Sequence, residues 1–229
     1  MNYFLKMLFF FNLIIFNSFL YAFTLVIDPG HGGKFNGCTS SNGKLLEKNV
    51  TLSIAQKLAT YLSEQENLQI ILTRNTDKHL ADELMDDLFK RVAIATLNNA
   101  NLFISIHLNA TSTNKEITNG FELYIPMHTK YPAQSYLLAS FLHHQLSQHI
   151  PPQFAGNLGN LNKQDGGIRA AKFNVISRAP CPAVLVELDY LSNPAVEELY
   201  LSEEYHLYIA QILAQGLIEY VDYFNKTTL

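Results

Sequence analysis

The chain has little of several residue types that mark particular classes of protein. It contains no tryptophan, only two cysteines (Cys38 and Cys181) and 16% charged residues, and its formal net charge is −4. No basic block stands out, so the electrostatic footprint of a nucleic-acid-binding protein is missing. The cysteines lack the spacing of a zinc knuckle. They lie far apart in the sequence, and we expect them to be unpaired, although two cysteines in an exported protein can form a disulfide.

Two compact catalytic motifs are also absent. The sequence has no H-E-x-x-H pair of metal ligands. The stretch GCTSSNGKL (Gly37–Leu45) comes close to a phosphate-binding loop, but it has five residues between its glycines and a leucine where serine or threonine is needed. We therefore expect neither a helical zinc-peptidase motif nor a nucleotide-binding P-loop.

A strongly apolar run stands at the amino terminus. Lys6 precedes MLFFFNLIIFNSFL (Met7–Leu20), and the next charged residue is Asp28. One positive charge before a short apolar segment is typical of a secretory signal peptide, and the run is short for a membrane span. We predict a signal peptide over residues 1–22, cleaved after Ala22, and one catalytic domain over residues 23–229. The alternative is a retained N-terminal anchor, which would also leave the domain outside the cytoplasm.

The rest of the chain alternates between strand and helix patterns. With 48% hydrophobic residues it can build a core of its own. Strands are expected at 24–28, 68–73, 102–107, 121–125, 173–177 and 183–191, and helices at 47–65, 83–100, 135–150 and 203–224. This alternation predicts a single α/β domain with a mainly parallel or mixed central sheet and helices on both faces. Continuous apolar strands such as AVLV fit a sheet that is buried on both sides.

Three apolar strands end at side chains that can bind a metal or transfer a proton. His31 follows TLVI, His107 ends LFISI, and Glu187 ends AVLV. In open α/β sheets, sites form at the carboxyl ends of the strands. A carboxylate that directly follows a buried strand needs a partner, because burying it unpaired is costly. Glu47, at the start of the first predicted helix, is a fourth candidate.

These residue types suit zinc. Two histidines and one glutamate can hold the ion and leave a fourth position for water. A second glutamate near that water can act as general base and then as general acid. Spacing alone does not say which glutamate has which role, and the ligands are scattered along the chain.

Seven blocks of the sequence, taken in order, carry a family resemblance. Together they resemble the zinc-dependent N-acetylmuramoyl-L-alanine amidases of the amidase-3 group. The blocks cover nearly the whole domain, and it is their ordered set that is specific. They are DPGHGG (Asp28–Gly33), LLEKNVTLSIAQKLATYL (Leu45–Leu62), ILTR (Ile71–Arg74), FISIHLNA (Phe103–Ala110), GFELY (Gly120–Tyr124), GIRAAKFNVI (Gly167–Ile176) and PAVLVELDYLSNP (Pro182–Pro194).

The resemblance implies roles for four residues. His31, Glu47 and His107 match the family's metal ligands, so Zn²⁺ is the expected cofactor, and Glu187 matches its catalytic carboxylate. The implied reaction is hydrolysis of the amide between N-acetylmuramic acid and L-alanine in peptidoglycan or a soluble muropeptide. The implied place of action is the periplasm or cell envelope, and we expect a monomer with no nucleic-acid partner.

Further roles are assigned as hypotheses. Asn109, Arg74 and Arg169 are candidate substrate contacts, the arginines for peptide or muramoyl carboxylates, although structural ion pairs would explain them equally well. Asp28 is expected to cap its turn or to orient a ligand histidine. The glycines around His31 would let the backbone pass close to a metal and a polymer.

The chain also departs from the family pattern. Asp189 stands where the family has glycine, and strand alternation would place it on the face of Glu187 and raise the pKa of that carboxyl. We find no long helical insertion between His107 and Glu187, which predicts a site that is open without an activator. Two other functions stay open at this point: a zinc peptidase or deacetylase with the same ligands, and a wall-binding module without catalysis.

Overall fold

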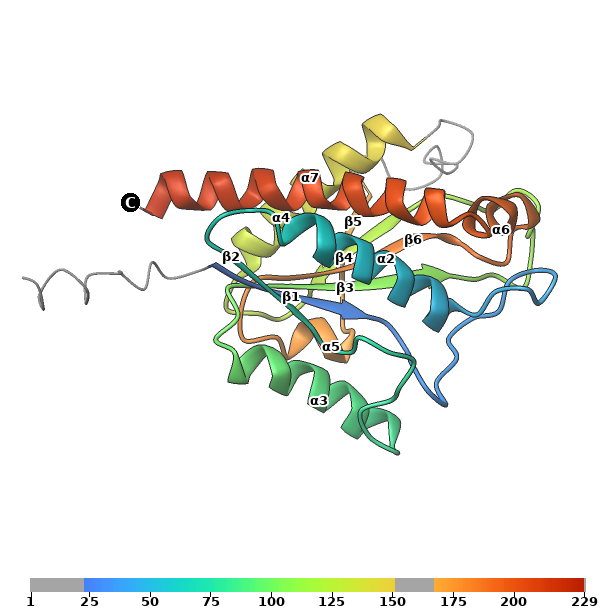
Figure 1. Cartoon of the computed structure of the whole chain (residues 1–229), viewed down its shortest axis with the longest axis horizontal. Helices are drawn as coiled ribbons and strands as arrows, with labels where there is room; N and C mark the ends of the chain where they lie inside the picture. Colours follow the sequence, from blue (N-terminus) through green and yellow to red (C-terminus); the bar gives the residue numbers. More distant parts are fainter. Residues whose placement is uncertain (1–22, 151–166, 229) are drawn as a thin grey trace, which may run out of the picture.

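One mixed β-sheet between two layers of helices forms the domain (Figure 1). The computed structural model describes residues 23–150 and 167–228. The sheet has six strands in the order β2-β1-β3-β6-β4-β5. The predicted single α/β domain with helices on both faces is confirmed. The predicted signal peptide, residues 1–22, lies outside the described residues.

The strands pair mostly in parallel. β1 pairs in parallel with β2 and β3, and β3 pairs in parallel with β6. β4 runs antiparallel to β6 and parallel to β5, which makes the sheet mixed. The strand bounds are β1 Phe23–Pro29, β2 Leu68–Leu72, β3 Leu102–Asn109, β4 Glu122–Pro126, β5 Ile168–Ala171 and β6 Ala183–Tyr190.

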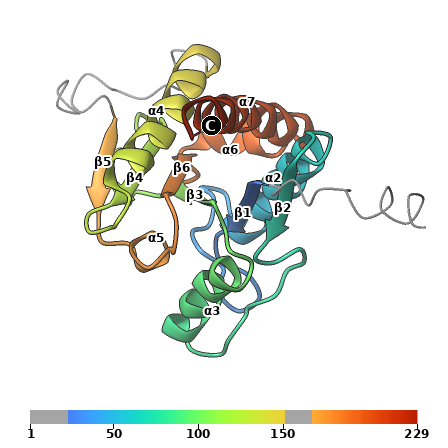
Figure 2. The same ribbon diagram turned by 90° about the vertical axis from the view of Figure 1, so that its left-hand side faces the viewer.

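The helices divide unequally between the two faces. In Figure 2 the sheet is seen along its strands, with α2, α4 and α7 on one side and α3 and α5 on the other. The helix bounds are α2 Glu47–Leu62, α3 Leu84–Leu97, α4 Pro132–His149, α5 Asn174–Ser177, α6 Pro194–Tyr200 and α7 Glu203–Thr228. No helix among the described residues is both long enough and apolar enough to cross a membrane.

Alternate side chains of the strands point to opposite faces of the sheet and belong to two separate hydrophobic cores. Leu25 and Ile27 of β1 belong to the large core under α2, α4 and α7, whereas Val26 between them belongs to a smaller core under α3 and α5. All seven residues of β1 are buried, as expected for a strand that is covered on both faces. His107 and Glu187 follow Phe103 and Leu185 of this smaller core at even spacing along β3 and β6, so they lie on the same face of the sheet.

Three local expectations were wrong or incomplete. FNVIS was predicted as a strand, but residues Asn174–Ser177 form the short helix α5, because a brief apolar run does not distinguish strand from buried helix. The apolar pattern of the predicted helix 83–100 would turn Leu84 inward together with Leu88 and Ala95, yet Leu84 is 53% exposed at the first turn of α3. The short elements β5 and α6 were not predicted, although Asn193 caps α6 through its side chain and Pro194 follows it.

Candidate functional site

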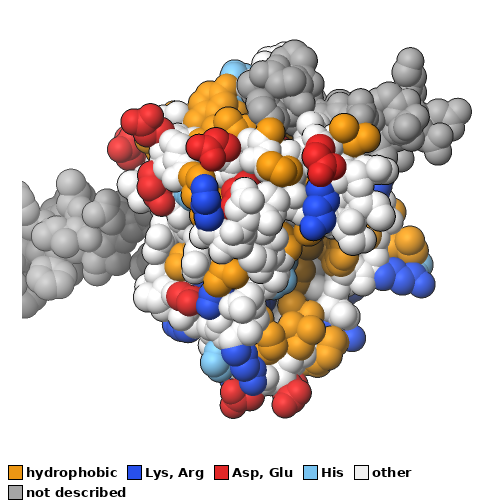
Figure 3. All heavy atoms as spheres, turned by 90° about the vertical axis from the view of Figure 1, so that its right-hand side faces the viewer, with side chains coloured by type: hydrophobic (Ala, Val, Ile, Leu, Met, Phe, Trp, Pro, Cys, Tyr) orange, Lys and Arg blue, Asp and Glu red, His pale blue; other side chains and the backbone are white. Residues whose placement is uncertain are grey.

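The strand register brings the predicted site residues to one end of the sheet. His107 of β3 is paired with Glu187 of β6, and Asp28 of β1 is paired with Ser105 of β3. His31 follows β1 by two residues, and Glu47 is the first residue of α2. Figure 3 shows this end of the molecule, where hydrophobic side chains are exposed beside a recess.

Three side chains meet within reach of one metal ion. His31 Nε2 and His107 Nδ1 each lie 3.0 Å from Glu47 Oε1. The three potential ligand atoms lie within 4.8 Å of one another, and among residues 23–150 and 167–228 they form the one such group of histidine, cysteine or acidic side chains. Ligands of a tetrahedral zinc ion at about 2.0 Å are separated by about 3.3 Å. The donor set and its spacing therefore fit a zinc ion with little rearrangement.

Two glycines make room for these ligands. A Cβ on Gly30 would lie 2.4 Å from the imidazole of His107, and a Cβ on Gly37 would lie 2.4 Å from Glu47 Oε2. Gly37 also has φ +69, which disfavours any other residue. Of the three glycines around His31, Gly30 lies against the His107 imidazole, whereas Gly32 and Gly33 face Arg74 and His79.

Glu47 is oriented by backbone donors as well as by the helix. The backbone N–H of Cys38 donates to Oε2 at 2.8 Å, and the backbone N–H of Leu108 donates to Oε1 at 3.0 Å. Burial raises the pKa of Glu47, but the hydrogen bonds from His107 and His31 outweigh it and lower the pKa overall. Glu47 is therefore charged, as a residue that could bind a cation needs to be. Neither Cys38 nor Cys181 forms a disulfide in the described part of the chain.

The loop that leads into Glu47 is tied to α6. Glu197 accepts hydrogen bonds from the hydroxyls of Ser40 and Ser41 and from the backbone and side-chain nitrogens of Asn42. Burial raises the pKa of Glu197, but these donors lower it to about 2. The carboxylate thus stays charged and holds residues 40–42 next to α6, which fixes where α2 begins.

Glu187 is a half-buried carboxylate that forms no ion pair among the described residues. Its Oε2 is buried and has no hydrogen-bond partner among the described residues. Burial raises its pKa to about 7; His107 opposes the shift, and Glu47 and Glu122 add to it. Such a carboxyl can accept and release a proton near neutral pH.

Asp189 does not have the effect expected from strand alternation. Its Oδ1 accepts hydrogen bonds from the backbone N–H groups of Gly120 and Tyr190. The carboxylates that raise the pKa of Glu187 are Glu47 and Glu122, not Asp189. The sheet register shifts between His107 and Asn109, where β3 runs beside this end of β6, so simple alternation does not apply here.

Two buried arginines clamp the loop that carries His31. Arg91 donates to the carbonyl oxygens of Pro29 (2.9 Å) and His31 (2.6 Å) and to Asp28 Oδ1 (2.9 Å). Arg74 donates to the carbonyl oxygens of Pro29 (2.9 Å) and Gly30 (2.8 Å). His31 has φ 63, a left-handed conformation that persists only where the surroundings impose it. The clamp supplies that constraint.

The clamp changes the roles expected for Arg74 and Asp28. Arg74 is 1% exposed and its donors point at backbone carbonyls, so the expectation that it holds a substrate carboxylate is wrong. Asp28 accepts from Thr73, Arg91 and Ser105, and no hydrogen bond joins it to an imidazole in the described residues. It therefore acts on His31 through Arg91 and the loop backbone.

Replacing Arg91 with lysine is expected to weaken Zn²⁺ binding about tenfold, because an ammonium group cannot reproduce a guanidinium fork that holds two carbonyls and two carboxylates. Competition with a chromogenic chelator measures the affinity. Arg178→Lys is the matched control, since that side chain stacks on Phe89 away from the loop. In a His31→Ala background, Arg91→Lys should not weaken Zn²⁺ binding any further. A tenfold loss of affinity in that background as well would mean that Arg91→Lys causes a general structural defect.

A second polar cluster, missed from the sequence, lies beside Glu187. Glu122 of β4 is paired across the sheet with Glu187 and is 6% exposed. Its carboxylate accepts hydrogen bonds from Asn109 (2.9 Å) and Arg169 (2.8 Å), two of the predicted substrate residues. An acidic residue within the apolar strand FELYI was the available signal.

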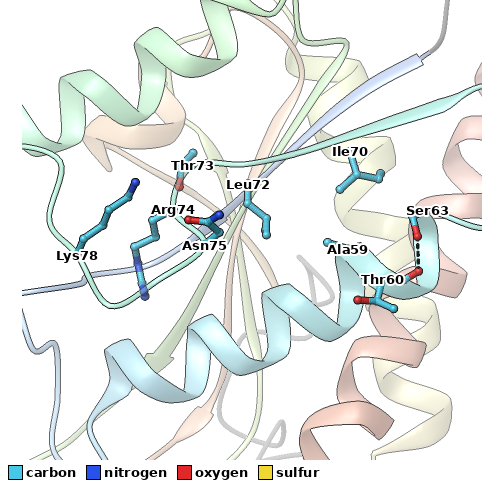
Figure 4. A pocket seen from close by; sticks show the side chains of 9 residues that line it. All are labelled: Ala59, Thr60, Ser63, Ile70, Leu72, Thr73, Arg74, Asn75 and Lys78. Atoms are coloured by element: carbon cyan, nitrogen blue, oxygen red, sulfur yellow. Dashed lines mark hydrogen bonds between the residues drawn. The ribbon is translucent and has the colours of Figure 1, made fainter.

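A groove of about 630 Å³ lies between α2 and the edge strand β2 and reaches Thr73 and Arg74 beside the clamp (Figure 4). Ile70 and Leu72 form one wall and Ala59, Thr60 and Ser63 the other, with Lys78 at one end. None of the metal-site residues lines it.

The chain is similar to proteins of known type along most of its length. The family model described as N-acetylmuramoyl-L-alanine amidase (Amidase_3) matches residues 25–219. The germination-specific N-acetylmuramoyl-L-alanine amidase of Bacillus subtilis (strain 168) is 31% identical over 205 residues, which are 86% of this chain and 78% of that protein.

Solved structures agree with this similarity. The catalytic domain of CwlV, an N-acetylmuramoyl-L-alanine amidase from Bacillus (Paenibacillus) polymyxa var. colistinus, has 32% identity and a TM-score of 0.71, covering 87% of this chain and 98% of that one. The CwlD amidase from Clostridioides difficile, solved in complex with the GerS lipoprotein, has 26% identity and a TM-score of 0.72, covering 87% and 98%. With its sheet, its histidine–glutamate–histidine group and these matches, the chain belongs to the Amidase_3 family of N-acetylmuramoyl-L-alanine amidases.

Proposed function

We propose that the chain is a zinc-dependent amidase that hydrolyses the bond between the lactyl carbonyl of N-acetylmuramic acid and the amine of L-alanine. The observation that carries this proposal is the Glu187 carboxylate, whose Oε2 is buried and has no hydrogen-bond partner among the described residues. Glu187 is paired across the sheet with His107, which belongs to the group His31, Glu47 and His107. Those three residues would hold the ion. When bound, Zn²⁺ supplies Lewis-acid chemistry, which polarises the scissile carbonyl and makes water more acidic.

Glu187 moves the protons in this proposal. Its carboxylate accepts a proton from the attacking water and then donates it to the nitrogen of L-alanine as the amide breaks. The pKa of about 7 suits both steps, because the group is neither too weak a base nor too weak an acid at neutral pH. The products are a free lactyl carboxylate on the sugar and a peptide with a free L-alanine amine.

The proposed route of the substrate is to the end of β3 and β6 that carries His107 and Glu187, on the face of the sheet shared with α3 and α5. α4, the long helix between His107 and Glu187, packs with α7 in the opposite layer. Asn109 and Arg169 stand next to Glu187 through their bonds to Glu122 and are proposed to contact the substrate. This arrangement supports an enzyme that needs no activating protein.

Digestion of soluble muropeptides and of isolated peptidoglycan by the purified chain, with Zn²⁺ and no other protein, tests this function. We expect stem peptides with a free L-alanine amine, identified by amine labelling and mass spectrometry. No release without a partner would contradict the open site. Release of acetate or of shorter peptides would identify a deacetylase or a peptidase instead.

We also propose that the chain acts outside the cytoplasm, in the periplasm or cell envelope, after removal of residues 1–22. Phe23, the first described residue, already belongs to β1; its side chain is 7% exposed and packs against Phe224 with 5.4 Å between ring centroids. Cleavage after Ala22 would make Phe23 the mature amino terminus and keep its packing against Phe224.

A further inference from the structure

The cluster around Glu122 joins four strands at the edge of the site. Glu122 Oε2 accepts hydrogen bonds from Asn109 Nδ2 at 2.9 Å, from the Tyr124 hydroxyl at 3.0 Å and from the Tyr190 hydroxyl at 3.2 Å. Its Oε1 accepts from an Arg169 guanidinium N–H at 2.8 Å. The donors come from β3, β4, β6 and β5. Both carboxylate oxygens are thus occupied, and the group is held rigidly.

Arg169 differs from the other members of this cluster in its exposure. About a third of its side chain (32%) is accessible, whereas the side chain of Glu122 is 7% accessible. A guanidinium carries five N–H donors, so it retains donors after bonding to Glu122. Its planar geometry matches a second carboxylate. The edge strand β5 therefore presents a fixed cation with a free side toward solvent.

Three carboxylates near Arg169 would repel a negatively charged substrate group. Glu47, Glu122 and Glu187 are three carboxylates in a small volume, and the last two are directly opposite each other across the β4–β6 pair. A negatively charged substrate group would be repelled there unless a cation met it. Glu122 is already neutralised by Arg169, and Arg169 is the part of this pair that a ligand can touch.

The chemistry of the substrate indicates what Arg169 would bind. In an intact muropeptide the muramoyl carboxyl is the acyl half of the scissile amide, so it carries no charge. Any free carboxylate of the substrate therefore belongs to the peptide. The nearest one to the scissile bond is the α-carboxylate of the residue after L-alanine, when that group is not amidated.

We propose that Glu122 is a positioning residue that holds Arg169 beside Glu187, so that Arg169 binds a free carboxylate of the stem peptide and the enzyme prefers acidic over amidated stems. This inference rests on the proposed amidase function. Tyr124 contributes to the rigidity of the cluster, because its ring also packs against Phe173 with 5.1 Å between centroids.

The test compares two muropeptides that differ in one group: a free α-carboxylate or a carboxamide on the second peptide residue. The unmodified chain, loaded with Zn²⁺, is expected to cleave the acid with a kcat/KM about ten times that of the amide, mainly through KM. Glu122→Gln and Arg169→Gln should each bring this ratio close to one. The double variant should show the same ratio as either single variant, because the two substitutions disrupt the same contact.

Arg178→Gln is the matched control, since it removes another exposed arginine that stacks on Phe89 and should keep the tenfold ratio. If Glu122→Gln does not fold, the exposed Arg169→Gln still decides the question. Equal cleavage of the two substrates by the unmodified chain, or a preference that survives both substitutions, would overturn the proposal. Failure to release peptide from either substrate or from peptidoglycan would instead overturn the amidase function.

Discussion

Replacing Glu187 with glutamine is expected to lower kcat about 10³-fold while Zn²⁺ binding and KM change little. Glutamine has nearly the same shape, so the strand and its neighbours should be preserved. It cannot accept the proton from water or deliver it to the leaving amine, and general acid–base catalysis contributes about 10²–10⁴-fold. Steady-state kinetics on a soluble muropeptide, with zinc content measured on the same samples, gives the result.

Asp189→Asn is the matched control for that experiment. Asp189 is a buried carboxylate two residues further along β6, and an asparagine oxygen can still accept from the backbone of Gly120 and Tyr190. Its kcat should therefore stay within a few-fold of the starting value. If Glu187→Gln retained most of the activity, the proton transfers would have to be assigned to another group.

Replacing His107 with alanine is expected to weaken Zn²⁺ binding by about 10²- to 10³-fold and to abolish turnover. The substitution removes one of three protein ligands and leaves Glu47 Oε1 with one histidine. Structural zinc sites with four ligands bind with about 10–16 kcal/mol, which corresponds to about 2.5–4 kcal/mol for each ligand. Chelator competition and elemental analysis measure the affinity and stoichiometry.

The control for this loss is His143→Ala. His143 lies on α4 and packs against Phe121 with 5.4 Å between ring centroids, apart from the ligand group. That variant should bind one zinc ion per chain with unchanged affinity. A His107→Ala protein that held one tightly bound zinc ion would show that the metal site lies elsewhere.

The elements that could be predicted from the sequence are those with long, regular patterns. β1, β3 and β6 are continuous apolar strands, and α2 repeats buried residues at Val50, Ile54, Leu58 and Leu62. Short elements were the ones misassigned. α5 has four residues, of which Val175 and Ile176 are buried, and this run is equally compatible with a strand.

The same division applies to the site. His107 and Glu187 end the apolar runs of β3 and β6, and His31 follows β1 by two residues, so the rule for strand ends pointed to them. Glu47 was a candidate by its place at a helix start, and only the family resemblance gave it a role. The supporting residues required the structure, because their role depends on where a distant segment folds back. Arg91 is 60 residues from His31, and Glu122 is 47 residues from Arg169. The charges of Arg91 and Glu122 alone suggest surface residues, whereas both side chains are buried.

Hydrolysis of a muropeptide in ¹⁸O-labelled water tests the central claim most directly. If Glu187 and the metal site activate water for attack on the lactyl carbonyl, mass spectrometry should find one ¹⁸O in the carboxylate of the released N-acetylmuramic acid and none in the peptide, whose L-alanine amine becomes free. Label in a peptide carboxylate or in acetate, with the lactyl–alanine bond intact, would contradict the account.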